Sequence, residues 1–204
     1  QRAAWMKANQ NSAFEEDPWV DQLVTGGAQI SSWRNAFLAE MNPYFEEMLR
    51  LLDPDLTCSL AYIDGGYGSS EEEGRERLAA GFVRDLRFGV SHYGPHRGDL
   101  EFRFKGSTAR DIASRGQAKI IASAVTLAHA ALLAKAYDKN PVILIDDFGA
   151  ELDEDRRQSF LKALMSLGCQ VIATTTDTPA DLLDYEALKE IRVFHVKQGA
   201  VSQE

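Results

Sequence analysis

The sequence has few cysteines, fewer basic than acidic residues and no long apolar run. Each of these shortages excludes a class of protein. Only Cys58 and Cys169 occur among 204 residues, so the chain is not a disulfide scaffold and suits a reducing compartment. Lysine and arginine total 22 against 31 acidic residues, a net charge of −9, which excludes a uniformly basic nucleic-acid coat. Any DNA contact therefore needs a local basic face. The apolar stretches at 120–134 and 142–145 are too short to span a membrane or contain His129.

The composition is otherwise ordinary for a globular protein with a core, at 45% hydrophobic and 26% charged residues. Aromatic and branched aliphatic residues are spread along the chain, which excludes a disordered protein. The first eleven residues, QRAAWMKANQN, read as the middle or end of a helix and do not begin with methionine. We therefore expect a fragment or an excised domain.

The first half of the sequence predicts helices with a few small strands. Apolar residues recur at three- or four-residue steps from 17 to 52, which indicates amphipathic helices with Trp33 in the core and a break at Gly26-Gly27. Residues 56–63 and 101–105 have strand patterns, and a glycine-rich loop occupies 65–68. Ser70 and Glu73 have capping-box spacing, which predicts a helix over 70–86.

The second half alternates helices and strands. Residues 112–137 predict a long helix, and 153–167 a helix that Gly168 ends. Strands are predicted at 141–145, which we expect to be buried on both faces, at 170–174 and at 191–196. This order indicates an α/β fold with a parallel sheet, in which ligands lie beyond the carboxyl ends of the strands. That edge would carry Asp146, Asp147 and residues 174–177.

Two short segments have the chemistry of a phosphate site. Asp146 and Asp147 follow a buried strand, where one carboxylate can hold Mg²⁺ and the next can orient water. A turn and a helix cap also account for two adjacent acids. Ser114-Arg115-Gly116-Gln117 begins the long helix, whose free N–H groups attract anions. An ordinary serine N-cap explains the same residues, and Asp153 alone is only an N-cap.

The order of these segments resembles the C-terminal half of an ABC-type ATPase head, and more closely the RecF family of DNA replication and repair ATPases, relatives of the SMC proteins. The segments that carry the resemblance are GPHRGDL at 94–100, ASRGQAK at 113–119, ILIDDFGAELD at 143–153 and QVIATTTD at 170–177. The resemblance covers nearly the whole chain. It implies a helical or arm subdomain similar to lobe II at 1–112 and a signature-helix and Walker B subdomain at 113–204.

The resemblance also implies a role for each candidate residue. Asp146 would hold Mg²⁺, and Asp147 would position or activate water as the catalytic carboxylate. The segment at 150–153, ending in Asp153, would be the D-loop at a dimer interface, and Thr176 would occupy the position where many ABC proteins carry a switch histidine. The signature that contacts the γ-phosphate of ATP on a partner subunit would consist of Ser114, Arg115, Gly116 and Gln117.

By the same resemblance, the parent would be a cytoplasmic protein without a membrane partner. It would bind ATP and Mg²⁺, form an ATP-dependent homodimer and bind duplex DNA near single-strand gaps together with RecO and RecR. DNA repair, replication, recombination and the SOS response would be its processes. No G-x-x-x-x-G-K-S/T motif occurs, since 65–70 lacks the lysine and 105–108 has the wrong order. We therefore expect the chain alone to be a poor ATPase.

Two other functions fit parts of the sequence. A stand-alone interaction domain would keep the fold without binding nucleotide. A metal-dependent phosphohydrolase would use Asp146 and Asp147 alone, but a signature helix would have no purpose there.

Overall fold

The structure is a computed structural model that describes residues 1–148, 153–176 and 191–203. Its contacts divide the chain into two units, one of Gln1–Pro43 with Cys58–Ile112 and one of Tyr44–Thr57 with Ala113–Glu204. Helix α2 (Val20–Leu52) contributes to both units, and Pro43 lies inside it at the boundary. The assignment of an arm to 1–112 and an ATPase subdomain to 113–204 stays a prediction.

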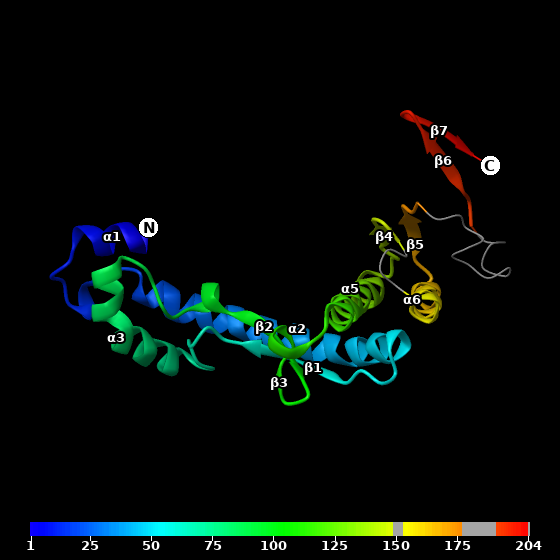
Figure 1. Ribbon diagram of the computed structural model, residues 1–204. Helices are drawn as coiled ribbons and strands as arrows, with labels where there is room; N and C mark the ends of the chain where they lie inside the picture. The colour runs from blue at the N-terminus through cyan, green and yellow to red at the C-terminus, as the bar shows by residue number, and fades with distance from the viewer. Residues whose placement is uncertain (149–152, 177–190, 204) are drawn as a thin grey trace. The chain divides into compact units, whose positions relative to one another are not determined.

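The first unit combines helices with a small antiparallel sheet, in the order β1-β2-β3 (Figure 1). Strand β1 (Cys58–Ile63) pairs with β2 (Asp99–Phe104), with Cys58 opposite Phe104 and Ile63 opposite Asp99. Strand β3 (Ser107–Thr108) pairs with the end of β2. The other elements of this unit are α1 (Arg2–Ala8), the 3₁₀ turn η1 (Phe14–Glu16), α3 (Glu71–Phe88), the 3₁₀ turn η2 (Pro95–Arg97) and α4 (Ala109–Ile112).

Helix α2 runs without interruption through Gly26 and Gly27, so the expected break at these glycines is wrong. Gly27 instead lies against the ring of Tyr67 from the glycine-rich loop, and a Cβ built on Gly27 would lie 2.6 Å from Tyr67 Cζ. Gly74 in α3 approaches the same ring. Tyr67 is fully buried, and its hydroxyl donates to the carbonyl of Val24. The missing side chains at Gly27 and Gly74 therefore make room for the ring between α2 and α3.

A buried network of charges connects α1 to α3. Arg2 Nε donates to Asp17 Oδ2 at 2.7 Å, and Arg2 Nη1 donates to Asp85 Oδ2 at 3.0 Å. Asp85, which is 0% exposed, also lies 2.7 Å from His92 Nδ1. Each buried carboxylate thus has a cationic or hydrogen-bonding partner, which is the condition under which burial of a charge is tolerated.

The second unit contains the parallel strands. Strand β4 (Val142–Ile145) pairs in parallel with β5 (Gln170–Ala173), and α6 (Glu154–Ser166) lies between them in the chain. The long helix α5 (Arg115–Tyr137) precedes β4. Helices and a parallel sheet confirm the α/β fold class.

Two expectations about the strands are wrong. The segment predicted as a third parallel strand contains β6 (Phe194–Lys197), which pairs antiparallel with β7 (Ala200–Gln203). Gln198 and Gly199 between them have φ of 51° and 80°, and two positive φ values are typical of a tight hairpin turn. Strand β4 is not buried on both faces, because Val142 and Leu144 are 53% and 74% exposed.

Helix α5 is apolar enough to raise the question of a membrane span. By length and composition alone it passes a test for such spans, with a mean hydropathy of 1.5, but core helices of soluble proteins pass the same test. Its buried residues recur at three- or four-residue steps, which is typical of a core helix; they are Ile120, Ile121, Ala124, Leu127, Ala128, Ala130 and Leu132. The absence of a membrane partner stays a prediction.

Candidate functional site

The two adjacent acids lie at the carboxyl end of β4, beside the end of β5. Because Ile145 is opposite Ala173 in the parallel pair, the next residues of the two strands meet. Thr174 Oγ1 donates to Asp146 Oδ1 at 2.6 Å and accepts the backbone N–H of Asp147 at 2.9 Å. One threonine hydroxyl therefore connects both acids.

The backbone at Asp147 has an uncommon conformation. Its φ is 56°, in the left-handed region that residues other than glycine adopt rarely and at an energetic cost. The next residue, Phe148, is 7% exposed and packs on Phe160 of α6, with ring centroids 5.9 Å apart. The turn is thus fixed by Thr174 on one side and by Phe148 on the other.

The side chains of this edge are accessible. Asp146, Asp147, Thr174 and Thr176 are all exposed. Within the described parts of the chain, no three His, Cys, Asp or Glu residues gather as a complete metal site. One or two carboxylates are nevertheless the contribution that a protein commonly makes to Mg²⁺, since phosphates and water supply the other oxygens. An exposed carboxylate at Asp146, with a second at Asp147 beside it, fits that ion.

The start of α5 forms a capping box. Ser114 Oγ accepts the backbone N–H of Gln117 at 3.2 Å, and Gln117 Oε1 accepts the backbone N–H of Ser114 at 2.9 Å. This geometry is that of an ordinary N-cap. The Ser114 hydroxyl keeps its proton for donation, and the first N–H groups of a helix have no partner within the helix. The arrangement therefore leaves the start of α5 able to bind an anion.

Arg156 connects two of the predicted segments, although no motif assigned it a role. Asp153 is the N-cap of α6, and its Oδ1 accepts the backbone N–H of Arg156 at 2.9 Å. The guanidinium lies 3.6 Å from Asp153 Oδ2 and 3.9 Å from Asp53 Oδ2. A Cβ built on Gly116 would lie 3.2 Å from Arg156 Nη1, so Arg156 extends to the start of α5. The spacing of Arg156 three residues after a cap is the only sequence signal for it.

The candidate residues thus gather in two groups, with Asp146 and Asp147 around Thr174, and Gly116 and Asp153 around Arg156. Thr176 is exposed just beyond β5. The rest of the predicted D-loop, residues 150–152, and Asp177 lie outside the described residues.

The GPHR segment forms η2 in the first unit. Arg34 Nη1 donates to the Pro95 carbonyl at 2.7 Å and to the Tyr62 hydroxyl at 3.1 Å. His96 Nε2 lies 3.1 Å from the Ser91 carbonyl oxygen. These contacts give the segment a role in packing α2, β1 and the loop before η2.

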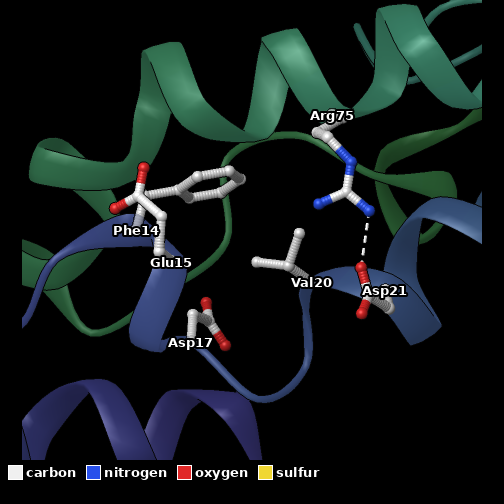
Figure 2. Close-up of a pocket in the computed structure, with 6 residues that line it drawn as sticks. All are labelled: Phe14, Glu15, Asp17, Val20, Asp21 and Arg75. Atoms are coloured by element: carbon white, nitrogen blue, oxygen red, sulfur yellow. Dashed lines mark hydrogen bonds and ion pairs between the residues drawn. The ribbon is translucent and has the colours of Figure 1, made fainter.

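Two hollows lie in the first unit, and no candidate residue is among those that line them. One of about 350 Å³ contains the 2.5 Å ion pair between Arg75 and Asp21 (Figure 2). Glu15 and Asp17 also line it, so its walls carry mostly negative charge and do not favour phosphate. The other, of about 500 Å³, is lined in part by Trp33 and Phe37. Trp33 is 64% exposed, so its expected place in the core is wrong.

Comparison with known proteins gives a consistent result, although no family model matches the chain. The chain is 32% identical over 203 residues to the DNA replication and repair protein RecF of Pseudomonas fluorescens and 33% identical over 204 residues to that of Pseudomonas aeruginosa. Each match covers 100% of the chain but 55% and 54% of the relative. The chain therefore spans about half the length of the curated relatives it matches.

Solved structures show the same fold. The structure of the recombination mediator protein RecF-ATP in the RecFOR pathway matches all of the chain and 54% of that protein, with a TM-score of 0.77 and 24% identity. A second structure, of RecF-ATPrS, matches with a TM-score of 0.66 and 23% identity. The fold and the relatives agree, and the chain is similar along its whole length to the C-terminal portion of RecF proteins.

Proposed function

We propose that the chain is the C-terminal part of a RecF-like, ATP-dependent DNA-binding protein of the bacterial cytoplasm that acts in DNA repair, replication restart and recombination. The observation that carries the proposal is the exposed acid pair, Asp146 and Asp147, held by Thr174 at the carboxyl ends of two parallel strands. Ligands of such sheets lie at this edge. The relatives are named as DNA replication and repair proteins or as a recombination mediator. These names support the proposed role in repair, replication and recombination.

In this proposal each acid has a separate task. Asp146 holds Mg²⁺, which neutralises charge on the phosphate oxygens when ATP is bound. The carboxylate of Asp147 accepts a hydrogen bond from the attacking water and so orients it. Thr176 donates a hydrogen bond to phosphate or water, but a hydroxyl cannot carry a proton charge near neutral pH as histidine can.

The second half of each site comes from another subunit. The signature residues named above, at the start of α5, present N–H groups and the positive end of the helix dipole to the γ-phosphate on the partner. Asp153 lies at the dimer interface. ATP thus bridges two heads, which couples homodimer formation to binding of duplex DNA near single-strand gaps. RecO and RecR are the proposed protein partners, and hydrolysis is slow and regulatory.

A stand-alone interaction domain is the second candidate function. The capping box favours it, because the hydrogen bond that Ser114 Oγ accepts from Gln117 is an ordinary structural role. This function predicts no nucleotide-dependent change in the protein.

The test is to join the chain to the N-terminal part of the Pseudomonas aeruginosa relative and to measure the molar mass by light scattering. With ATP and Mg²⁺ we expect a dimer, and with ADP or no nucleotide a monomer. Anisotropy with a gapped duplex should show tighter binding with ATP. A joined protein that binds ATP but stays monomeric contradicts the shared site, and one that binds no ATP favours the interaction domain.

A further inference from the structure

Thr174 makes four hydrogen bonds to the segment that carries the acids, although the sequence assigned it only a place at the same edge of the sheet. Besides the two hydroxyl bonds to Asp146 and Asp147, its backbone N–H donates to the Ile145 carbonyl at 2.9 Å. Its carbonyl accepts the N–H of Phe148 at 2.7 Å. The backbone bonds hold the two strand ends together, and the hydroxyl adds a contact to each acid.

The hydroxyl fixes the two acids in different ways. A hydroxyl has a single proton, and here it points to Asp146 Oδ1, so that oxygen is held in place as an acceptor. The hydroxyl oxygen in turn accepts the N–H of Asp147, the residue with the positive φ. A positive φ is uncommon outside glycine, although aspartate tolerates it better than most residues, and this bond helps to keep the turn in the observed conformation.

We propose that Thr174 is a positioning residue that sets the geometry of the metal-binding and water-orienting carboxylates through its hydroxyl. The inference rests on the proposed function, but it is specific to a hydroxyl at this position. Valine has nearly the shape of threonine and can form neither bond, whereas serine keeps the hydroxyl. Thr126, whose hydroxyl donates to the Ala122 carbonyl within α5 at 3.0 Å, provides a matched control.

The first measurement is amide hydrogen exchange at Asp147 by NMR in the full chain, with circular dichroism to verify that each variant is folded. In Thr174→Val we expect the Asp147 amide to exchange about tenfold faster. This is the loss of protection against exchange that the removal of one hydrogen bond gives. Thr174→Ser and Thr126→Val should exchange at the unmodified rate. This readout reports the position of the turn without any nucleotide.

The second measurement is Mn²⁺ affinity in the presence of ATP, by electron paramagnetic resonance, in the joined protein described above. We expect Thr174→Val to bind Mn²⁺ about tenfold more weakly. A tenfold loss is the lower end of the range of affinity losses seen when residues that orient metal ligands are replaced. Thr174→Ser should restore the affinity.

The outcomes separate the two hypotheses. Unchanged amide exchange or unchanged Mn²⁺ affinity in Thr174→Val overturns the role of Thr174 and leaves the proposed function intact. No ATP-dependent Mn²⁺ binding in the unmodified joined protein overturns the proposed function, and the positioning role with it.

Discussion

Replacing Gly27 by alanine should lower the free energy of unfolding, whereas the same change at the adjacent Gly26 should raise it. Both glycines lie inside α2, so they share a helix and differ in sequence position by one residue. They differ in their surroundings, because Gly27 faces the buried ring of Tyr67 and Gly26 has no atom within 4 Å of a built Cβ. The pair therefore isolates packing from helix propensity.

The magnitudes follow from two opposing terms. Alanine in place of glycine inside a helix gains about 1 kcal/mol at either position. At Gly27 the new Cβ would lie 2.6 and 2.8 Å from ring carbons of Tyr67, and the ring cannot move freely because its hydroxyl is bound to the Val24 carbonyl. Overpacking of this kind costs about 1–3 kcal/mol. Such short contacts favour the upper end of that range, so Gly27→Ala should be destabilising on balance.

Urea unfolding followed by circular dichroism measures the difference directly. The Gly26→Ala midpoint should lie above that of the unmodified protein, and the Gly27→Ala midpoint below it. In a Tyr67→Leu background the ring is absent, and the two alanine variants should then unfold at similar urea concentrations. Equal midpoints for the two variants in the presence of Tyr67 would refute the packing role of Gly27.

Three further predictions concern the candidate site and the buried tyrosine. In the joined protein, Asp147→Asn should lower ATP turnover by about a hundredfold or more while ATP binding is retained, and normal turnover in a steady-state assay would remove Asp147 from the catalytic role. Ser114→Ala should weaken ATP-driven dimerisation, measured by light scattering, more than ATP binding by the monomer. Ser114→Thr, which keeps a capping hydroxyl, serves as its control, and equal effects on both measurements would contradict a role across the interface. Burial raises the pKa of Tyr67 above its ordinary value of 10.0, so the fold favours the neutral phenol. The contribution of this neutral phenol to the free energy of unfolding is present below pH 10.0. It is lost as the pH rises through the pKa of Tyr67 in the folded protein. Tyr67→Phe should remove that part of the pH dependence of the unfolding free energy.

The elements with local signals could be predicted from the sequence. Ser70, Ser114 and Asp153 each cap the helix that the sequence placed after them, because a cap depends on residues within one turn. The role of Gly27 could not be predicted in this way, since its partner Tyr67 comes from a loop distant in sequence. The antiparallel pairing of β6 was also missed, although Gln198-Gly199 is a turn signal that the apolar pattern of the preceding strand obscured.

The sequence identified which residues form the candidate site better than it identified the contacts between them. The motifs identified the acid pair and the start of α5, and the strand order placed Thr174 at the same edge as the acids, which its hydrogen bonds confirm. The sequence assigned Thr174 no individual contact and gave Arg156 no role. The hydrogen bonds of Thr174 depend on the register between β4 and β5, which a single sequence does not specify. Arg156 meets Gly116 through the packing of α6 near the start of α5, which is likewise a tertiary relation.

The exposed strands and the exposed acids point to the same explanation. A sheet of only two strands has marginal stability by itself. Here Leu144 of β4 and Ile172 of β5 are 74% and 54% exposed. A stand-alone interaction domain accounts for an apolar surface, but it gives no function to two exposed acids that one threonine holds at the strand ends. A nucleotide site completed by further protein accounts for both, because the sheet gains neighbours and the carboxylates gain phosphate and metal. The placement of the exposed acids at the strand ends therefore favours the shared ATP site over the interaction domain.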